Sequence, residues 1–488
     1  MTVRREELAQ VLRPLQLFII AAGGIGVGWI IVVGEWLRQA GPLGAIVGFL
    51  AGTAVVLLAA LCYAEMAGSF PVTGGEMVYC YEVYGPGVGF VIGWFMVLAY
   101  VAIASFEAIS IGWVMESLLP GSQGPLLTTV AGQPLRTGSL AAGVLGTWGL
   151  AYINYRGIKW SAKVQDVLSW TFLGAALLFI AAGILGGSIA NLNPGFQRTA
   201  SGAILPGILA VFLVTPNFLT GFTLIPQMME ESVPGSSRRA AAVMLLSVVV
   251  RTAFFCLVIL ACAMAVPWTT LVGTKLPAAD AFQMAFRSAF LAKLVLFAGL
   301  IGLLLVWNGM ILAGSRLLFA LSRARFIHPA FARTREGSRT PAVAIAFVAL
   351  FATVGLLLGR KALIPILTVT STVQALVFVL LAVGIVRLRR TRPDLPRPYR
   401  IPGGSVVAVV AAAGSAIALW LAITEPYKAV ARGIPLEWWI ILVWAALGLV
   451  VWIGSGGYRR SVSEAERRRL MLGDTASEGT ASARRPGR

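Results

Sequence analysis

Apolar runs, each long enough to cross a lipid bilayer, follow one another along most of this sequence and constrain its fold more than any other feature. A membrane-spanning helix needs roughly 20 apolar residues. Because 58% of the 488 residues are hydrophobic and only 12% are charged, a soluble domain would lack the polar surface needed to cover itself. The sequence therefore predicts an all-α polytopic membrane protein with about twelve transmembrane helices. The predicted spans are 14–38, 43–67, 87–118, 139–154, 164–189, 203–230, 240–266, 290–322, 341–358, 362–387, 404–424 and 436–454.

The distribution of basic residues predicts the orientation of the chain. The sequence holds 39 Lys and Arg against 20 Asp and Glu, a formal net charge of +19. With the N-terminus in the cytoplasm, most of these basic residues lie on the cytoplasmic side, including 323–340, 387–400 and the tail after 459. Basic loops that set topology and contact anionic lipid explain this charge better than nucleic acid does. We expect a multi-pass protein of the cell (inner) membrane with both termini cytoplasmic and no nucleic-acid partner.

Few side chains suit catalysis or metal binding. Cys62, Cys80, Cys256 and Cys262 lie in or beside apolar runs without the spacing of a metal site, and the only histidine, His328, lies in a basic loop. We find neither a metal-ligand cluster nor an obvious pair of nucleophile and base. The sequence therefore predicts no enzyme, no metal and no cofactor.

The first span contains an unusual glycine cluster. Gly23, Gly24, Gly26 and Gly28 fall within six positions, although each glycine inside a helix costs about 0.5–1 kcal/mol relative to alanine. Unwound backbone is tolerated in a membrane only where it is buried in protein or lines a watery cavity. The cluster therefore favours a break that faces a site, with close helix packing as the alternative.

The sixth span contains a second interruption, at Pro216, Asn217 and Gly221. Paired interruptions five helices apart indicate an inverted repeat of five helices, with substrate held between the two broken helices. The amide ends of half-helices suit a carboxylate and the carbonyl ends suit an ammonium group. A zwitterionic substrate matches this polarity.

Several motifs together resemble the amino acid-polyamine-organocation (APC) transporters. "GGIGVGW" resembles their helix 1 glycine motif, and "LCYAEMAGSFPVTGGEMVYCYEVYGPGVGFVIGW" resembles their helix 2 to helix 3 segment. "NYRGIKWSAKVQ", "FLTGFTLIPQMMEESVPGSSRRAA", "SRLLFALSRARFIHPAFA", "RTPAVAI" and "RPYRIPGG" follow in the family's order. The resemblance runs from about residue 14 to 455. It implies a LeuT-type fold of ten core helices plus two and alternating access as an amino acid permease.

The resemblance also implies a substrate site on the two broken helices. The helix 1 backbone that would receive the substrate carboxylate is Ile25, Gly26, Val27 and Gly28. The helix 6 carbonyls that would receive the amino group belong to Asn217, Phe218 and Thr220, with Gly221 and Phe222 as hinge and lid.

Two departures from the family pattern bear on coupling, besides a local one at Met77 and Tyr79. Thr223 stands where many relatives place an acid, so that acid-dependent steps are not expected there. Phe172, flanked by Thr171, stands near the place where some proton-coupled members carry a helix 5 lysine. We therefore do not expect lysine-type coupling.

A stripe on helix 3 supplies the coupling candidate. Met96, Tyr100, Ala104 and Glu107 share one face at helical spacing, and that face matches the pocket-lining face of the family. Glu107 is either a proton-coupling group or a carboxylate bonded to a neighbouring helix. Further candidates, each of which could instead make an interhelical polar contact, are Trp307, Asn308 and Gln374.

The other charges in or beside the spans are assigned structural roles. We expect Glu65 to form an ion pair or a cap, and Glu230 with Glu231 to form gate or loop salt bridges beside Arg238 and Arg239. Arg251 is expected to snorkel or to pair with a neighbouring helix, with Glu107 as one conceivable partner.

The predicted function is secondary active transport of amino acids or related amines. Proton symport is preferred, with sodium as the alternative ion, exchange as the alternative mechanism and a membrane substrate sensor as the alternative class. The predicted organisation is a cytoplasmic N-terminus at 1–13, inverted repeats at 14–190 and 203–387, and helices 11 and 12 at 404–454. The basic cytoplasmic tail at 459–488 is expected to be disordered after a short helical start.

Overall fold

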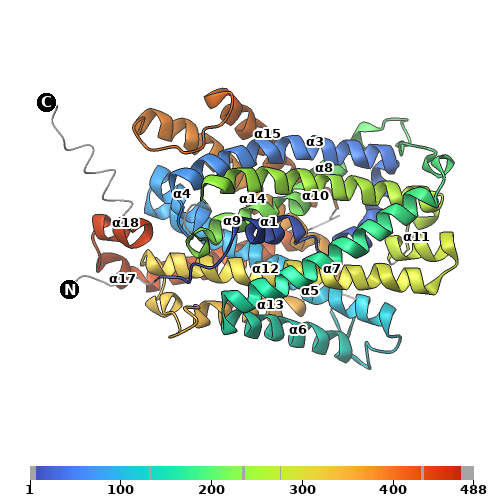
Figure 1. Ribbon diagram of the computed structural model, residues 1–488, viewed down its shortest axis with the longest axis horizontal. Coiled ribbons are helices and arrows are strands. Elements are labelled where there is room, and N and C mark those ends of the chain that lie inside the picture. The colour runs from blue at the N-terminus through green and yellow to red at the C-terminus, as the bar shows by residue number, and fades with distance from the viewer. Residues whose placement is uncertain (1–6, 131–132, 234–236, 275, 430–432, 474–488) are drawn as a thin grey trace.

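Long helices run side by side in one bundle (Figure 1). This computed structural model describes residues 7–130, 133–233, 237–274, 276–429 and 433–473. Ten helical segments in this part of the chain are long and apolar enough to cross a membrane. They are formed by α1 (Pro14–Gly23) with α2 (Gly28–Ile31), α3 (Val33–Ser69), α5 (Pro86–Leu118), α7 (Ile158–Leu185), α8 (Leu205–Leu219) with α9 (Leu224–Gln227), α10 (Ser237–Ala265), α12 (Ala289–Arg323), α14 (Leu363–Thr391), α15 (Gly404–Ala429) and α16 (Leu436–Gly454).

Two further helices coincide with predicted spans but fall outside that set. They are α6 (Thr137–Arg156) and α13 (Ala342–Leu356), the second of which has 15 residues. The count of twelve spans therefore stays a prediction.

The boundary between the first two spans lies inside α3. Gly41 has φ 71° and ψ 170°, which divides α3 into two helices, and Pro42 follows it. A Cβ on Gly41 would lie 2.7 Å from the backbone nitrogen of Gln197, so the turn also needs a glycine for space. The first crossing therefore continues through α2 to residue 40, and the second begins at residue 42.

Short elements connect the spans. They comprise α4 (Gly75–Tyr84), α11 (Pro277–Phe286), the antiparallel hairpin of β1 (Leu126–Val130) and β2 (Gln133–Arg136), and the 3-10 turns η1 (Ile189–Leu192), η2 (Thr220–Thr223), η3 (Met229–Glu231), η4 (Trp268–Leu271), η5 (Pro329–Ala332) and η6 (Arg360–Ala362). Among the spans, α5 is the most enclosed and α16 the least. The centre of the bundle is thus built around α5, and α16 lies at its periphery.

One end of the bundle carries the first and last described residues, and we call it the terminal face (Figure 1). The backbone amides of Val11 and Leu12 both donate to the Glu231 carbonyl at 2.8 Å. The tail forms α17 (Gly456–Arg460) and α18 (Glu464–Leu472), in which Arg467 and Leu470 are buried. The predicted helical start of the tail is therefore observed and reaches Leu472, and the rest of the tail, 474–488, lies outside the described residues.

Contacts of α18 explain why this part of the tail is ordered. Arg467 donates to the Ala324 carbonyl at 3.1 Å, and Arg468 forms two hydrogen bonds with the carboxylate of Glu82 on α4, at 3.0 and 2.8 Å. The composition of the tail suggests that its charged side chains lie in solvent, but Arg467 and Arg468 bind buried groups of the bundle. The tail is therefore part of the terminal face.

Candidate functional site

The first span is interrupted at the glycine cluster. Helix α1 ends at Gly23, and α2 begins at Gly28 after four residues that belong to neither helix. A Cβ on Gly26 would overlap Oε1 of Glu107. Because Gly26 has no side chain, the Glu107 carboxylate of α5 can lie against the backbone of the first span.

The sixth span is interrupted at a matching depth. Helix α8, which contains Pro216, ends at Leu219 and continues as the 3-10 turn η2 and the short helix α9. A Cβ on Gly221 would overlap the backbone oxygen of Ala21. The two interruptions therefore face each other, as the predicted site requires.

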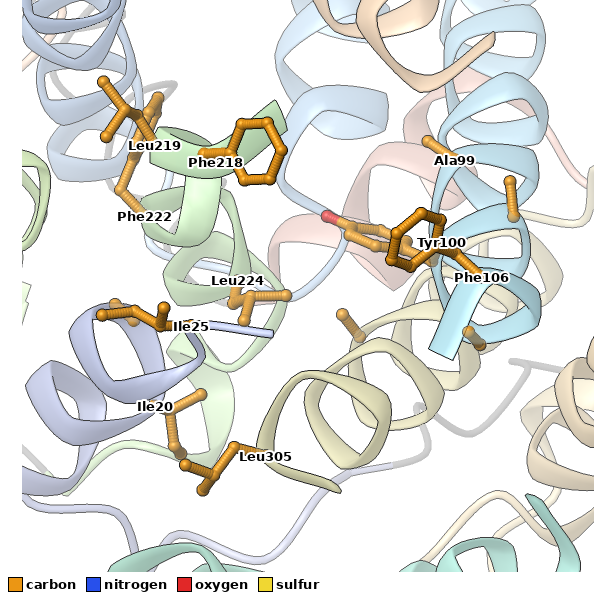
Figure 2. Packing of buried hydrophobic residues seen from close by; sticks show 14 of the residues in the cluster. Ile20, Ile25, Ala99, Tyr100, Phe106, Phe218, Leu219, Phe222, Leu224 and Leu305 are labelled. Carbon is orange, nitrogen blue, oxygen red and sulfur yellow. The ribbon is translucent and has the colours of Figure 1, made fainter. Parts of the chain in front are cut away.

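A cavity of about 60 Å³ lies between the interruptions and α5. This volume holds roughly four water molecules. In Figure 2, Phe218 from α8 and Tyr100 and Phe106 from α5 point toward the same space. The lining consists of Gly24, Ile25, Gly26, Gly28, Ala99, Tyr100, Ile103, Phe106, Glu107, Asn217, Phe218, Thr220, Gly221, Thr223, Arg251, Phe255, Val306, Met310, Leu367 and Gln374.

Glu107 is buried at the wall of this cavity, with 2% of its surface exposed. Its carboxylate accepts a hydrogen bond from the backbone amide of Val27, within the interruption of the first span. The second oxygen, Oε2, is buried and has no hydrogen-bond partner. Glu107 therefore places a carboxyl group directly on the backbone that was predicted to receive a substrate carboxylate.

Arg251 of α10 reaches both interruptions. Its Nη1 donates to the Phe218 carbonyl at 2.9 Å, and its Nη2 donates to the Gly24 carbonyl. The side chain is buried, and Nε has no hydrogen-bond partner. Within the described part of the chain, no acidic side chain lies within 4 Å of its nitrogens. Arg251 therefore does not pair with Glu107, and it bonds to neighbouring helices, as predicted in the alternative to snorkelling. Its two partners join both broken helices.

Many residues of the predicted site meet at this cavity. The predicted residues that line it are Ile25, Gly26, Gly28, Tyr100, Glu107, Asn217, Phe218, Thr220, Gly221, Thr223 and Gln374. The predicted residues outside its lining are Val27, Met96, Ala104, Phe222, Trp307 and Asn308. For both groups, contact with substrate remains a prediction.

The residues outside the lining have other neighbours. The Phe222 ring packs edge to face on Tyr63, with ring centroids 5.2 Å apart. A Cβ on Gly146 of α6 would lie 2.6 Å from the Trp307 ring, so the indole lies against α6. On α5, Ala99, Ile103 and Phe106 line the cavity in place of Met96 and Ala104. The lining face of α5 thus keeps Tyr100 and Glu107 and extends toward Ala99, Ile103 and Phe106 rather than toward Met96 and Ala104.

Asn308 and Asn217 make interhelical contacts. The Asn308 side chain accepts from Asn154 of α6 at 2.8 Å and donates to Gln165 of α7 at 3.0 Å, which confirms the alternative interpretation of this residue. The Asn217 side chain donates to the Leu367 carbonyl of α14 at 3.0 Å. Asn217 therefore lines the cavity, and its side chain also holds α8 against α14.

Glu65, Glu230 and Glu231 are paired with arginines at the terminal face. Arg389 donates to Oε1 of Glu65 at 2.9 Å, and the Ile401 amide donates to Oε2 at 2.8 Å, which confirms the predicted ion pair. Glu231 pairs with Arg316 at 2.8 Å, and Glu230 pairs with Arg323 of the same helix, α12.

Sequence reasoning missed the part that Arg251 plays at this cavity. An arginine inside the apolar span 240–266 is itself the signal, because charged groups within a bilayer are costly and mark functional sites. Its apolar neighbours in the lining, Phe255, Val306, Met310 and Leu367, carry no such signal.

Comparison with known proteins agrees with this architecture. A family model described as amino acid permease matches residues 12–447. The branched-chain amino acid permease BcaP of Bacillus subtilis (strain 168) is 27% identical over 465 residues, covering 92% of this chain and 94% of that protein. The methylthioribose transporter of the same organism is 26% identical over 466 residues, covering 92% and 94%. The amino-acid permease RocE of that organism is 28% identical over 341 residues, covering 68% and 69%.

The family model spans most of the chain, and the curated relatives are permeases and transporters rather than enzymes. The chain therefore belongs to the amino acid permease family of the APC superfamily, as its sequence motifs predicted.

Proposed function

We propose that this protein is a secondary active transporter that moves amino acids across the cell membrane by alternating access, in symport with protons. The observation that carries the proposal is the cavity between the two interruptions, which combines bare backbone with the buried charges of Glu107 and Arg251. A carboxyl group and a guanidinium group on one small cavity suit the two polar ends of a zwitterion. The family model and BcaP support amino acids as the substrate class.

The finer fold belongs to the same proposal. We assign twelve spans in a LeuT-type arrangement, with inverted repeats at 14–190 and 203–387 and two additional helices. The facing interruptions of spans one and six support this assignment. So does the packing of α5 against α12, the third helix of each proposed repeat. Both termini are assigned to the cytoplasm, because the terminal face is rich in arginine.

A neutral sugar is the second candidate substrate, because the methylthioribose transporter covers the same part of the chain as BcaP does. Such a solute would leave the Glu107 and Arg251 charges without partners in the cavity. Amino acids therefore fit this site better.

Glu107 is the proposed coupling group. It is the one acidic side chain that lines the described cavity, and protonation of its carboxyl would change the charge of the site. Glu107→Gln should still bind amino acid and exchange it, because the amide keeps an acceptor oxygen. The same variant should lose proton-driven accumulation and show a flat pH dependence, because it cannot release a proton.

Purified protein in liposomes tests both proposals. Accumulation of labelled amino acid under an imposed proton gradient, which a sodium gradient does not replace, is the expected result. Uptake only with amino acid on the far side would indicate exchange, and binding without transport would indicate a sensor. Glu116→Gln, at the far end of α5, is the matched control and should keep proton-driven accumulation. If Glu107→Gln accumulates substrate with an unchanged pH profile, the coupling assignment is wrong.

A further inference from the structure

Three polar side chains that line the cavity each keep one buried atom without a hydrogen-bond partner. These atoms are Nε of Arg251, Oε2 of Glu107 and Oε1 of Gln374. Buried polar atoms are nearly always satisfied in folded proteins, so unpartnered ones around one cavity point to a ligand. The set offers one charged donor and two acceptors.

The donor is the most informative of the three. A buried guanidinium without an anionic partner is expensive, because its desolvation is offset only by dipoles. The carbonyls of Phe218 and Gly24 supply such dipoles to Nη1 and Nη2. No described acid lies within 4 Å of the group, whereas the buried arginines of α12 that pair with Glu230 and Glu231 each have one. An anionic group entering the cavity would supply the missing counter-charge.

We infer that Arg251 binds the carboxylate of the substrate and thereby selects amino acids over amines and neutral solutes. This inference rests on the proposed function and deepens it. The two free acceptors, on Glu107 and Gln374, face the amino end of the substrate.

The assignment differs from the site implied by family resemblance. That site places the carboxylate on the amides of the first span and the ammonium on carbonyls of the sixth. In this chain the Val27 amide already donates to Glu107, and the Phe218 carbonyl already accepts from Arg251. Glu107 and Arg251 therefore already bind part of the first-span amides and of the sixth-span carbonyls. The unpartnered atoms of these two side chains are then the groups that bind the substrate.

Binding measurements on the purified full chain in detergent test the inference. Dissociation constants are compared for L-leucine, L-lysine and L-alanine, each beside its methyl ester, at a pH where the ester amine stays protonated. The wild type should prefer the free amino acid by roughly 10- to 100-fold, as expected for a hydrogen bond to a charged group. In Arg251→Gln and Arg251→Met this preference should fall to within about twofold.

Controls separate recognition from structure. Arg251→Met is included because a long unbranched apolar side chain is easily buried where glutamine could prevent folding. Phe255→Leu, which changes an uncharged residue of the same lining, should weaken amino acid and ester equally and leave their ratio unchanged.

The outcomes are distinct. If folded Arg251 variants keep the wild-type ratio, Arg251 only joins the broken helices and the inference is wrong. A wild type that binds amino acid and ester equally overturns the inference alone. A wild type that binds methylthioribose and none of the amino acids overturns the proposed function together with it.

Discussion

Buried charges are treated differently at the terminal face and at the cavity. At the terminal face, Glu231 and Arg316 are 1% and 0% exposed and satisfy each other through two hydrogen bonds, at 2.8 and 3.2 Å. At the cavity, Glu107 and Arg251 are similarly enclosed, yet they bind backbone groups and keep free polar atoms. Burial alone therefore does not identify a functional charge. The presence or absence of a counter-charge distinguishes the two regions.

The largest expected effect comes from adding a side chain at the glycines of the two interruptions. Gly221→Leu should abolish uptake, because a side chain there meets the Ala21 carbonyl and the Arg251 guanidinium. Gly26→Leu should do the same, because its Cβ would occupy the space of the Glu107 carboxylate. Uptake into liposomes, with membrane levels of each variant measured alongside, checks both.

A matched glycine sharpens this test. Gly174 lies on the exposed face of α7, and a Cβ at this position would have no heavy atom of another residue within 4 Å, its chain neighbours and its own helix backbone aside. Gly174→Leu should therefore keep near-normal uptake. If Gly26→Leu and Gly221→Leu also transport normally, the glycines serve packing and the substrate site lies elsewhere.

The next effect concerns stability. Arg316→Met should lower the free energy of unfolding by about 3–5 kcal/mol, because it leaves the Glu231 carboxylate buried without a counter-charge. Arg251→Met should cost less than half as much, because no described acid loses a partner. Denaturant unfolding in detergent measures both. Adding Glu231→Met to Arg316→Met should recover most of the loss. If Arg316→Met and Arg251→Met lower the free energy of unfolding equally, a counter-charge does not distinguish the terminal face from the cavity.

The smallest expected effect lies on α4, outside the ten candidate spans. Burial raises the pKa of Glu76 to about 7, while Gln227 donates to one of its oxygens. A raised pKa means that the folded protein favours the protonated form of Glu76. The contribution of this proton to the free energy of unfolding is therefore complete below the ordinary pKa of 4.5, and it is lost as pH rises through about 7. The thermal midpoint should therefore fall by a few degrees between mildly acidic and mildly basic buffer.

Glu76→Gln should flatten this pH dependence, because the amide does not titrate. Glu82→Gln on the same helix is the control: it removes a carboxylate paired with Arg392 and Arg468, and should lower the midpoint at both pH values. An unchanged slope in Glu76→Gln would assign the pH dependence to another group.

Much of this architecture could be predicted from the sequence. Apolar runs place the long helices within a few residues, because a bilayer demands a fixed length of apolar chain. The interruptions at Gly23–Gly28 and at Pro216–Gly221 were also predictable, since glycine and proline leave backbone without helical bonds. Both Glu65 and Glu107 were singled out by their charge within apolar runs.

The parts that could not be predicted depend on distant partners. The part that Ala99, Ile103 and Phe106 of α5 play in the lining could not be predicted, because they are as apolar as their neighbours and periodicity does not distinguish the two faces. Arg251 reaches carbonyls that are 33 and 227 residues away in sequence. The order of α18 likewise depends on Glu82, which lies 386 residues from Arg468.

A further contact of α18 links it, through α12, to the end of the sixth span. Arg323 donates to the carboxylate of Glu230 in η3 and also to the Met471 carbonyl of α18. A movement that separates η3 from the end of α12 must therefore disturb the packing of the tail as well. By thermodynamic linkage, a binder that holds α18 in place resists that movement, and a binder that pulls α18 away assists it. Helix α18 is thus a point on the terminal face through which a binding partner could act on the sixth span.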